Sequence, residues 1–402
     1  MNKNVPKLRF KGFEDEWKEY KLGDFSEKIT EKNKGFKVEN VISNSAKNGL
    51  ISQRDFFEKD IANKNNIDGY YIIKNGDFVY NPRKSNEAPY GPINKYKFKD
   101  DGVVSPLYFC FRINNKVNND YLEEYFKSSK WYKYVYMKSD QGARHDRVSI
   151  KDLEVMKMKI KLPSLEEQGK VADFLSNVDK IIEEQEGKVQ DLELYKKGMM
   201  QKIFKQEIRF KDDNGLDYPA WETTSIEEIS QIKMGFTPST KDDNAWNGDV
   251  EWLSIAGMTS KYIYGGNKKI SYELLGKREL VPQDTLIMSF KLTIGRLAIV
   301  KKKLMTNEAI CQFYWKNNNI LNEYMYGYLS TVNISSFGCR AAKGITLNTE
   351  SLNSIVVKLP CLEEQIKIAN FLSNIDKLKE EEQKNLDDLR EMKKGLLQQM
   401  FV

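Results

Sequence analysis

The sequence predicts an α/β (α+β) protein made of two similar halves. Each half is a globular body followed by one long helix, and the two helices pair as an antiparallel coiled coil. Three observations predict this fold: a long repeated segment, a heptad spacing of apolar residues inside it, and strand-rich bodies that are alike only at their two ends. The repeat is weighed first because it fixes the architecture of a chain. We therefore expect a pseudo-two-fold internal repeat that holds two unlike globular domains.

The repeated segment runs from Leu162 to Phe204 and again from Leu359 to Phe401, without a gap and with more than half of the positions identical. Each copy opens with Leu-Pro, and proline is tolerated near the start of a helix but not inside one. Ser164 suits the N-cap position because a glutamate follows it at the capping-box spacing. At a rise of about 1.5 Å per residue, each copy predicts a helix on the order of 60 Å long.

Apolar residues recur in both copies at alternating steps of three and four, which is the spacing of a coiled-coil seam. Near the middle of each copy the same spacing falls on polar residues. In an antiparallel pair Lys188 would face Glu382, and such polar layers fix the register of the helices. Gln185 would likewise face Asn385. The alternative is a solvated interruption of each helix. The predicted seam consists of Val171, Phe174, Val178, Ile181, Gln185, Lys188, Leu192, Ile368, Phe371, Ile375, Leu378, Glu382, Asn385 and Leu389.

A chain of 402 residues is long enough for more than one domain. The two bodies share an opening, in which a tryptophan precedes a short helix, and a closing strand that leads into Leu-Pro. Between these ends their sequences differ, although Gly, Asn and Pro divide both into short strands. The predicted domains are a globular domain at residues 1–161, a long helix at 162–206, a second globular domain at 207–358 and a second long helix at 359–402.

The motifs of common enzyme classes are missing from the sequence. It contains no GxxxxGK[ST] loop, no GxSxG and no HExxH, so we expect no catalytic residue and no cofactor bound by this chain. One histidine and four scattered cysteines argue against a metal site, and we expect the cysteines to be buried free thiols. We also expect a cytoplasmic protein, because no apolar run is long enough to span a bilayer and no N-terminal apolar signal is present.

Four loops in the bodies combine Lys and Arg with Asn, Ser, Thr and Tyr. Such side chains neutralise phosphates and pair with the edges of bases. Any one loop alone would be interpreted as ordinary polar surface. Four of them in two similar halves make DNA binding as good an interpretation as ordinary polar surface. The candidate DNA-binding residues are Arg83, Lys84, Ser85, Asn86, Tyr90, Arg144, His145 and Arg147 in the first body, and Lys291, Thr293, Arg296, Lys343 and Thr346 in the second.

The duplicated helix start LPxLEEQxKxAxFLSNxDK, with EEQ at residues 166–168 and 363–365, is joined to two dissimilar bodies. In this it resembles the DNA-specificity subunit of Type I restriction–modification systems, and the resemblance covers essentially the whole chain. It implies that each body is a target recognition domain for one half of a split, asymmetric DNA site. It also implies that the helices space these domains and dock two methyltransferase subunits, to which two motor–nuclease subunits are added for restriction.

The same resemblance implies that the chemistry belongs to the partner subunits. They would methylate adenine N6 in each half-site and would use S-adenosylmethionine, ATP and magnesium, while this chain binds no cofactor and is not an enzyme. The alternative from another class is a coiled-coil scaffold whose two globular domains bind protein. Salt separates the two hypotheses, since DNA binding falls steeply as salt is added.

Overall fold

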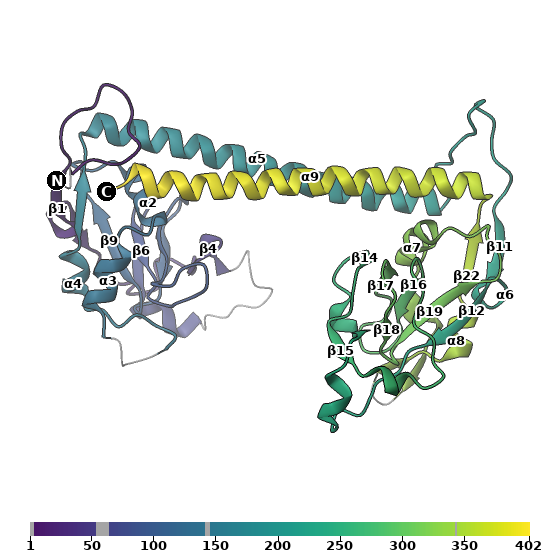
Figure 1. The fold of residues 1–402 in the computed structure, drawn as a ribbon. Helices are drawn as coiled ribbons and strands as arrows, with labels where there is room; N and C mark the ends of the chain where they lie inside the picture. Colours follow the sequence, from purple (N-terminus) through teal and green to yellow (C-terminus); the bar gives the residue numbers. More distant parts are fainter. Residues whose placement is uncertain (1–3, 54–63, 141–144, 342–343) are drawn as a thin grey trace. The chain divides into compact units, whose positions relative to one another are not determined.

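The structure is a computed structural model that describes residues 4–53, 64–140, 145–341 and 344–402 (Figure 1). The chain forms two compact units: unit 1 consists of Met1–Glu186 and Lys384–Val402, and unit 2 consists of Gly187–Gln383. Each unit thus combines one globular body with a part of each long helix. The predicted α/β fold class with two long helices is confirmed, whereas the predicted domain boundaries stay a prediction.

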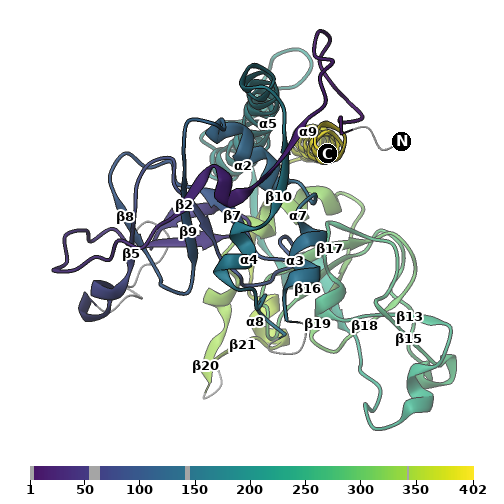
Figure 2. The same cartoon turned by 90° about the vertical axis from the view of Figure 1, so that its left-hand side faces the viewer.

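Unit 1 is built on a four-stranded antiparallel sheet. Its strands, in spatial order, are β2 (Ser26–Lys28), β9 (Phe109–Ile113), β6 (Phe78–Tyr80) and β7 (Ile93–Lys95). Successive side chains of a strand point to opposite faces, so Phe78 and Tyr80 of β6 pack in a core with the helices, while Val79 packs in a second core. This second core lies between the sheet and two smaller strand pairs, β3 (Ile42–Ser45) with β4 (Gly49–Ser52) and β5 (Tyr71–Ile73) with β8 (Gly102–Val104). Figure 2 shows β5 and β8 on the far side of the sheet from helices α3 (Tyr132–Lys138) and α4 (Asp152–Met156).

The strands of unit 1 are β1 (Lys18–Lys21), β2 (Ser26–Lys28), β3 (Ile42–Ser45), β4 (Gly49–Ser52), β5 (Tyr71–Ile73), β6 (Phe78–Tyr80), β7 (Ile93–Lys95), β8 (Gly102–Val104), β9 (Phe109–Ile113) and β10 (Lys159–Leu162). Its shorter helices are α2 (Asn119–Lys127), α3 (Tyr132–Lys138) and α4 (Asp152–Met156). The long helix α5 (Leu165–Phe204) begins in unit 1 and continues into unit 2.

Unit 2 contains a five-stranded sheet in the order β12-β19-β16-β17-β14 and a three-stranded sheet in the order β15-β13-β18. Its strands are β11 (Glu222–Ser225), β12 (Ser230–Met234), β13 (Val250–Leu253), β14 (Tyr262–Ile263), β15 (Lys268–Ile270), β16 (Leu286–Ser289), β17 (Leu297–Val300), β18 (Met305–Thr306), β19 (Ile310–Trp315), β20 (Cys339–Ala341), β21 (Gly344–Thr346) and β22 (Val356–Leu359). Its helices are α6 (Ile226–Ile229), α7 (Asn322–Thr331) and α8 (Thr349–Asn353), and α9 (Leu362–Met400) begins here and ends in unit 1.

The two bodies share one frame although their sequences differ between the two ends. The first four strands of the large sheet in unit 2 repeat the order and the antiparallel pairing of the sheet in unit 1. In both bodies an early strand pairs with the strand that precedes the long helix: β1 with β10 in unit 1, and β11 with β22 in unit 2. Unit 2 differs in having β14 and the second sheet, which are the elaborations of its own interior.

The long helices run antiparallel within each unit. In unit 1, Asp179 of α5 pairs with Lys393 of α9, and Glu186 further along α5 pairs with Arg390, which is earlier in α9. In unit 2, Lys196 lies 2.5 Å from Asp376 and the earlier residue Glu193 lies 2.9 Å from Lys379. The pairs Asp179–Lys393 and Asp376–Lys196 occupy the same places in the two copies of the repeat, with the helices exchanged.

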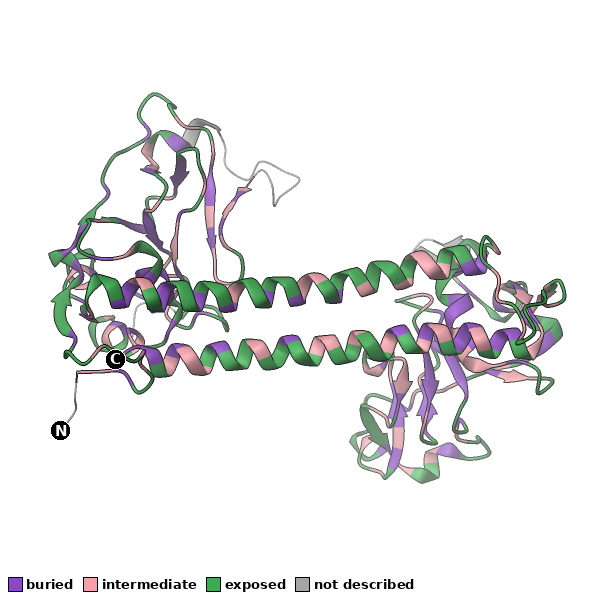
Figure 3. Ribbon diagram, turned by 90° about the horizontal axis from the view of Figure 1, so that it is seen from above, coloured by how far each residue is buried: buried purple, intermediate pink, exposed green. Residues whose placement is uncertain are grey.

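Figure 3 shows buried residues recurring along each long helix. These buried positions differ from the predicted seam at every second position. Five predicted seam residues, Phe174, Ile181, Lys188, Leu378 and Asn385, are exposed, and Phe371 is only partly buried. The next residue after each of these six positions is Leu175, Ile182, Val189, Leu372, Lys379 or Leu386. Five of these residues are buried, and Lys379 is partly buried. The seam therefore steps by four and then three, not by three and then four.

Every second position of the seam is common to both spacings, so the sequence alone does not separate them. Val171, Val178, Gln185, Ile368 and Ile375 are buried, as expected for either spacing, and Leu192, Leu389 and Glu382 are partly buried. Lys188 and Asn385 are exposed, and Val189 and Leu386 beside them are buried. The predicted facings of Lys188 with Glu382 and of Gln185 with Asn385 stay predictions.

The skipped aromatic residues have another role in the fold. The ring of Phe174 meets that of Phe10 edge-on at 5.7 Å, and Phe371 meets Phe210 at 5.6 Å, so they hold the segment that opens each body. In the described part of the chain, no helix is both long and apolar enough to cross a membrane.

Candidate nucleic-acid interface

In unit 1 the predicted DNA-binding loop is the connection between β6 and β7, residues 81–92. Its two ends are held together because Asn81 N–H donates to the Pro92 carbonyl at 3.0 Å. Within it, Arg83 N–H donates to Asn81 Oδ1 at 3.1 Å, and the Tyr80 hydroxyl donates to the Tyr90 carbonyl at 2.8 Å. The base of the loop is thus fixed by hydrogen bonds, while residues 83–87 at its tip are exposed.

The second predicted loop of unit 1 lies directly against the first. Lys84 N–H donates to the Asp146 carbonyl at 2.9 Å, and Val148 N–H donates to the Pro82 carbonyl at 2.8 Å. Arg83 and Arg147 consequently form an isolated antiparallel bridge. Two segments more than sixty residues apart in the chain are thus brought to one surface, with Arg83, Lys84, Arg147 and the exposed His145 together. Arg144 lies outside the described residues.

A buried asparagine that the sequence analysis missed organises this surface. The Asn44 amide donates to the Val79 carbonyl at 2.7 Å and accepts from the Asn94 amide at 2.6 Å, while Asn81 donates to the Asn44 carbonyl at 2.9 Å. These bonds tie the β3–β4 hairpin to both ends of the 81–92 loop. No spacing rule points to Asn44, because its partners lie on strands that meet only in the folded sheet.

Gly91 is required by the shape of this loop, and its substitution gives a first testable prediction. Its φ is +81°, and an added Cβ would lie 2.1 Å from the Asn81 carbonyl oxygen. We expect Gly91→Ala to destabilise unit 1 by at least the 1–2 kcal/mol, roughly, that a left-handed conformation costs a residue with a Cβ. Gly69→Ala is the matched control, since nothing lies within 4 Å of its Cβ position. Urea denaturation of both variants checks the prediction, and equal stability would contradict it.

In unit 2 the corresponding loop joins β16 to β17 and spans residues 290–296. The buried Ser289 closes it: Ser289 N–H donates to the Arg296 carbonyl at 2.8 Å, and its hydroxyl accepts from Arg296 N–H at 3.1 Å and donates to the Thr293 carbonyl. Phe290 packs in the core below, and Lys291 lies over the Phe290 ring at 5.3 Å. Lys291, Thr293 and Arg296 are exposed, so the loop presents two cations and a hydroxyl to solvent.

The second predicted loop of unit 2 belongs to the β20–β21 hairpin. Thr346 pairs with Cys339 in this hairpin, while Lys343 lies outside the described residues. The hairpin follows a short 3-10 helix, Ile334–Phe337, whose Ile334 packs 3.6 Å from the Cβ position of Gly295. The 290–296 loop therefore contacts the 3-10 helix that precedes the second predicted segment of unit 2.

The described loops carry groups that are suited to binding. Among the described residues, no group of three or more His, Cys, Asp or Glu side chains is placed to hold a metal ion. Burial raises the pKa of the Cys311 thiol to about 12 and also raises that of Cys110, so both thiols stay protonated. Cys361 is partly buried. Basic and hydroxyl groups on exposed, hydrogen-bonded loops are suited to phosphates and base edges.

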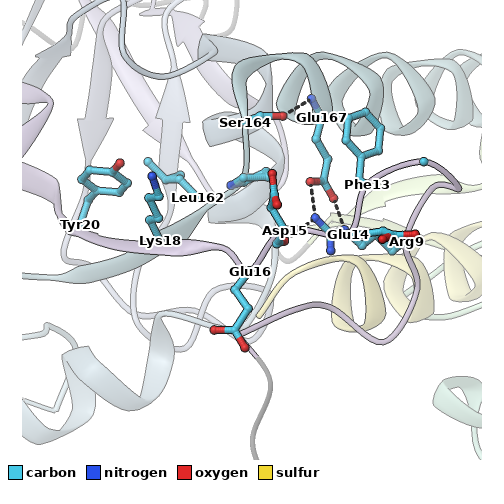
Figure 4. Close-up of a pocket in the computed structure, with 12 residues that line it drawn as sticks. Arg9, Phe13, Glu14, Asp15, Glu16, Lys18, Tyr20, Leu162, Ser164 and Glu167 are labelled. Atoms are coloured by element: carbon cyan, nitrogen blue, oxygen red, sulfur yellow. Dashed lines mark hydrogen bonds and ion pairs between the residues drawn. The ribbon is translucent and has the colours of Figure 1, made fainter.

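The repeated EEQ motif stabilises the fold and is not part of the candidate DNA-binding loops. Arg9 holds the Glu167 carboxylate with two hydrogen bonds of 2.8 and 2.9 Å (Figure 4). Trp17 Nε1 also donates to this carboxylate, at 3.3 Å. The hydrogen bond to Glu167 is the largest cause that raises the pKa of Arg9. Ser164 accepts from Glu167 N–H at 3.3 Å, as the capping prediction requires. The predicted use of the carboxylate in a capping box is replaced by this ion pair.

Gln168, the last residue of the motif, caps a second helix. Its Oε1 accepts from Asn118 N–H at 2.8 Å at the start of α2, and Gln365 accepts from Leu321 N–H at 2.9 Å at the start of α7. A pocket of about 430 Å³ lies beside the ion pair, but its walls include Glu14, Asp15 and Glu16. These carboxylates would repel phosphates, so the pocket is not part of the candidate interface.

A family model described as the Type I restriction modification DNA specificity domain matches the chain twice, at residues 14–194 and 219–389. The chain belongs to this family. Each match covers one body and most of its long helix, which agrees with the shared frame of the two units. The predicted recognition of the family is therefore confirmed.

Curated relatives come from Methanocaldococcus jannaschii. The Type I restriction enzyme MjaIX specificity subunit is 29% identical over 50% of this chain and 48% of its own length, so the chain spans about half of that relative. The putative type I restriction enzyme MjaX specificity subunit is 26% identical over 85% of this chain and 80% of its own length. The MjaVIII specificity subunit is 26% identical over 74% of this chain and 72% of its own.

Solved structures show the same fold at lower identity. A chain from a study of complex assembly and conformational transition of the type I R-M system matches with a TM-score of 0.64 and 15% identity, covering 96% of this chain and 97% of that chain. The S subunit of a Type-I restriction-modification system from M. genitalium matches with a TM-score of 0.50 and 14% identity, covering 99% of both chains.

Proposed function

We propose that this chain is the DNA-specificity subunit of a Type I restriction–modification complex and that each unit reads one half of a bipartite, asymmetric duplex site. One observation carries the proposal. The 81–92 loop and the 290–296 loop occupy the same hairpin of a sheet with the same strand order, yet their sequences differ. A repeated frame with unlike exposed loops is what two different half-sites require.

The contacts of each loop support a reading role. Their backbones are fixed by hydrogen bonds, as for Asn81 with Pro92 and Ser289 with Arg296, so exposed side chains are held in defined places. Arg83 and Arg296 offer the planar fork that bridges guanine, and lysines such as Lys84 neutralise phosphates. Which of these side chains contact bases and which contact phosphates stays a prediction, as do the roles of all thirteen candidate residues.

The reaction itself is assigned to partners. We propose that two methyltransferase subunits bind this chain and methylate adenine N6 in each half-site, and that motor–nuclease subunits join them for restriction. An adenine inside a duplex must leave the stack before its N6 can react. S-adenosylmethionine, ATP and magnesium would be bound by those partners, and this chain would contribute position and sequence choice without catalysis.

The test is a pair of matched double variants in a reconstituted complex with the methyltransferase. Arg83→Ala with Lys84→Ala removes two cations from the loop that joins the end of β6 to the start of β7. Lys74→Ala with Lys116→Ala removes two exposed cations from turns where β6 begins and β9 ends. If the first double variant removes a base contact, we expect DNA binding to weaken by about 1–3 kcal/mol. If it removes a phosphate contact, we expect the salt dependence of DNA binding to fall.

Mapping of methylated adenines in a host that carries each variant provides the second readout. The loop variant should lose or relax one half-site and leave the other unchanged, whereas the control should return the unaltered site. Binding that does not weaken as salt is added, or loop variants with unaltered affinity and specificity, would contradict DNA reading by this surface and favour a protein-binding scaffold.

A further inference from the structure

The tip of the 290–296 loop in unit 2 exposes an apolar side chain in a strained backbone conformation. Leu292 is 93% exposed, and its φ is +63°, in the left-handed region that favours glycine. A left-handed backbone conformation costs a residue with a Cβ about 1–2 kcal/mol. An exposed apolar side chain contributes no packing within the folded chain that would offset this cost. Strain that the fold does not use is concentrated at functional positions.

The apolar neighbours of Leu292 in the loop pack on the core of unit 2, whereas Leu292 itself does not. Phe290 and Ile294, two residues before and two residues after, pack on the core of unit 2, and Phe290 is fully buried. The loop therefore already directs two of its three apolar side chains inward. Leu292 is directed out by a backbone that Ser289 and Gly295 hold closed, since Gly295 has a φ of +85° and its N–H donates to the Ser289 carbonyl at 2.8 Å.

The charges around Leu292 favour one kind of occupant. Lys291 precedes it, and Arg296 follows at the foot of the loop, where its Nη1 donates to the Ile255 carbonyl at 3.1 Å. An apolar tip flanked by cations is a poor surface for another apolar protein face. It is suited to a duplex, because the cations meet phosphates while the apolar side chain meets the stacked bases.

We propose that Leu292 is a wedge that enters the stack between two base pairs of the half-site read by unit 2. This rests on the proposed function of the loop and adds a mode of reading to it. Apolar side chains inserted at a base step unstack it and kink the duplex, and flexible steps deform at the lowest cost. Unit 2 would thereby select its half-site partly by the deformability of a step that it does not hydrogen-bond.

The experiment uses the full chain and synthetic duplexes that carry its mapped site, with 2-aminopurine placed at successive positions of the half-site read by unit 2. Saturating wild-type chain is expected to raise the 2-aminopurine fluorescence at one step, because the base there loses its stacking partner. Leu292→Ala should lose this rise, and Leu292→Met, which keeps a long apolar side chain, should retain it. Leu216→Ala removes another exposed leucine of unit 2, outside the loop, and should behave as the wild type.

Leu292→Gly separates a wedge from a structural role. Glycine relieves the positive φ, so the melting temperature should not fall, while the fluorescence rise should be lost. A fall in melting temperature with the rise retained would overturn the proposal, as would a wild-type chain that binds its site with no rise at any step. A wild-type chain that binds no duplex would overturn the proposed function first, so the two failures are distinguishable.

Discussion

Replacing Glu167 by alanine is expected to lower the free energy of unfolding of unit 1 by about 3–5 kcal/mol, the loss seen when one partner of a buried ion pair is removed. Only 2% of the Glu167 side chain is exposed, and the carboxylate accepts hydrogen bonds from both Arg9 and Trp17. Without it the Arg9 guanidinium loses its counter-ion and the indole N–H loses its acceptor. The segment that opens the body would then lose its main polar anchor.

The control lies one residue earlier in the same motif. The Glu166 side chain is 73% exposed and pairs with Lys170 one turn away, and such surface pairs contribute about 0.3–0.5 kcal/mol. Urea denaturation followed by tryptophan fluorescence checks both variants, because Trp17 is buried beside the ion pair. Equal stabilities for Glu166→Ala and Glu167→Ala would contradict the assignment.

The same experiment can be repeated in unit 2, where the second copy of the motif builds the same anchor. Glu364 is fully buried, Arg209 lies 2.6 Å from it, and Trp221 Nε1 donates to it at 2.9 Å. Glu364→Ala should therefore destabilise unit 2 as Glu167→Ala destabilises unit 1. An effect in one copy alone would show that the anchor is not a property of the repeat.

Leu372→Ala is expected to destabilise unit 2 by about 2–5 kcal/mol, while Leu378→Ala in the same helix should change its stability by about 0.5 kcal/mol or less. Leu372 is 4% exposed and packs in the core of unit 2 against the Cβ position of Gly327, whereas Leu378 is 50% exposed. The two residues are chemically identical, so the difference between them measures the position of the buried stripe. Thermal and urea unfolding of the two variants provide the measurement.

This comparison tests which face of α9 is buried. The spacing predicted from the sequence places Leu378 in the seam and Phe371, not Leu372, beside it. A larger loss for Leu378→Ala than for Leu372→Ala would restore that spacing. From the structure we expect the reverse, because Phe371 packs against Phe210 and Leu372 packs in the core of unit 2.

The helices, the duplication and the family could be predicted from the sequence because they depend on local and repeated signals. Proline at the start of each copy, a capping serine at Ser164 and a heptad-like recurrence of apolar residues suffice to predict two long helices. The choice between two heptad phases could not be predicted, because both phases share Val171 and Val178 and apolar residues lie at both intervening positions. Only the neighbours in space decide which of Phe174 and Leu175 is covered.

The candidate interface was predictable in composition and not in geometry. The sequence indicates basic, hydroxyl-rich loops, but their assembly depends on contacts between distant segments, such as Lys84 with Asp146. Asn44 gave no local signal, and Leu292 reads in the sequence as one more apolar residue of a strand-rich body. Its exposure follows from a positive φ that the closed loop imposes.

The sequence by itself determined that this protein is a duplicated chain with two long helices, two unlike bodies and no familiar catalytic motif. Those properties depend on residue type and on spacing along the chain, and they do not require contacts between distant segments. The tertiary structure alone decided which face of each helix is buried, what Glu167 and Gln168 hold, and which loops share a surface. These depend on packing between residues far apart in the chain, and packing selects among alternatives that local spacing leaves equal in energy.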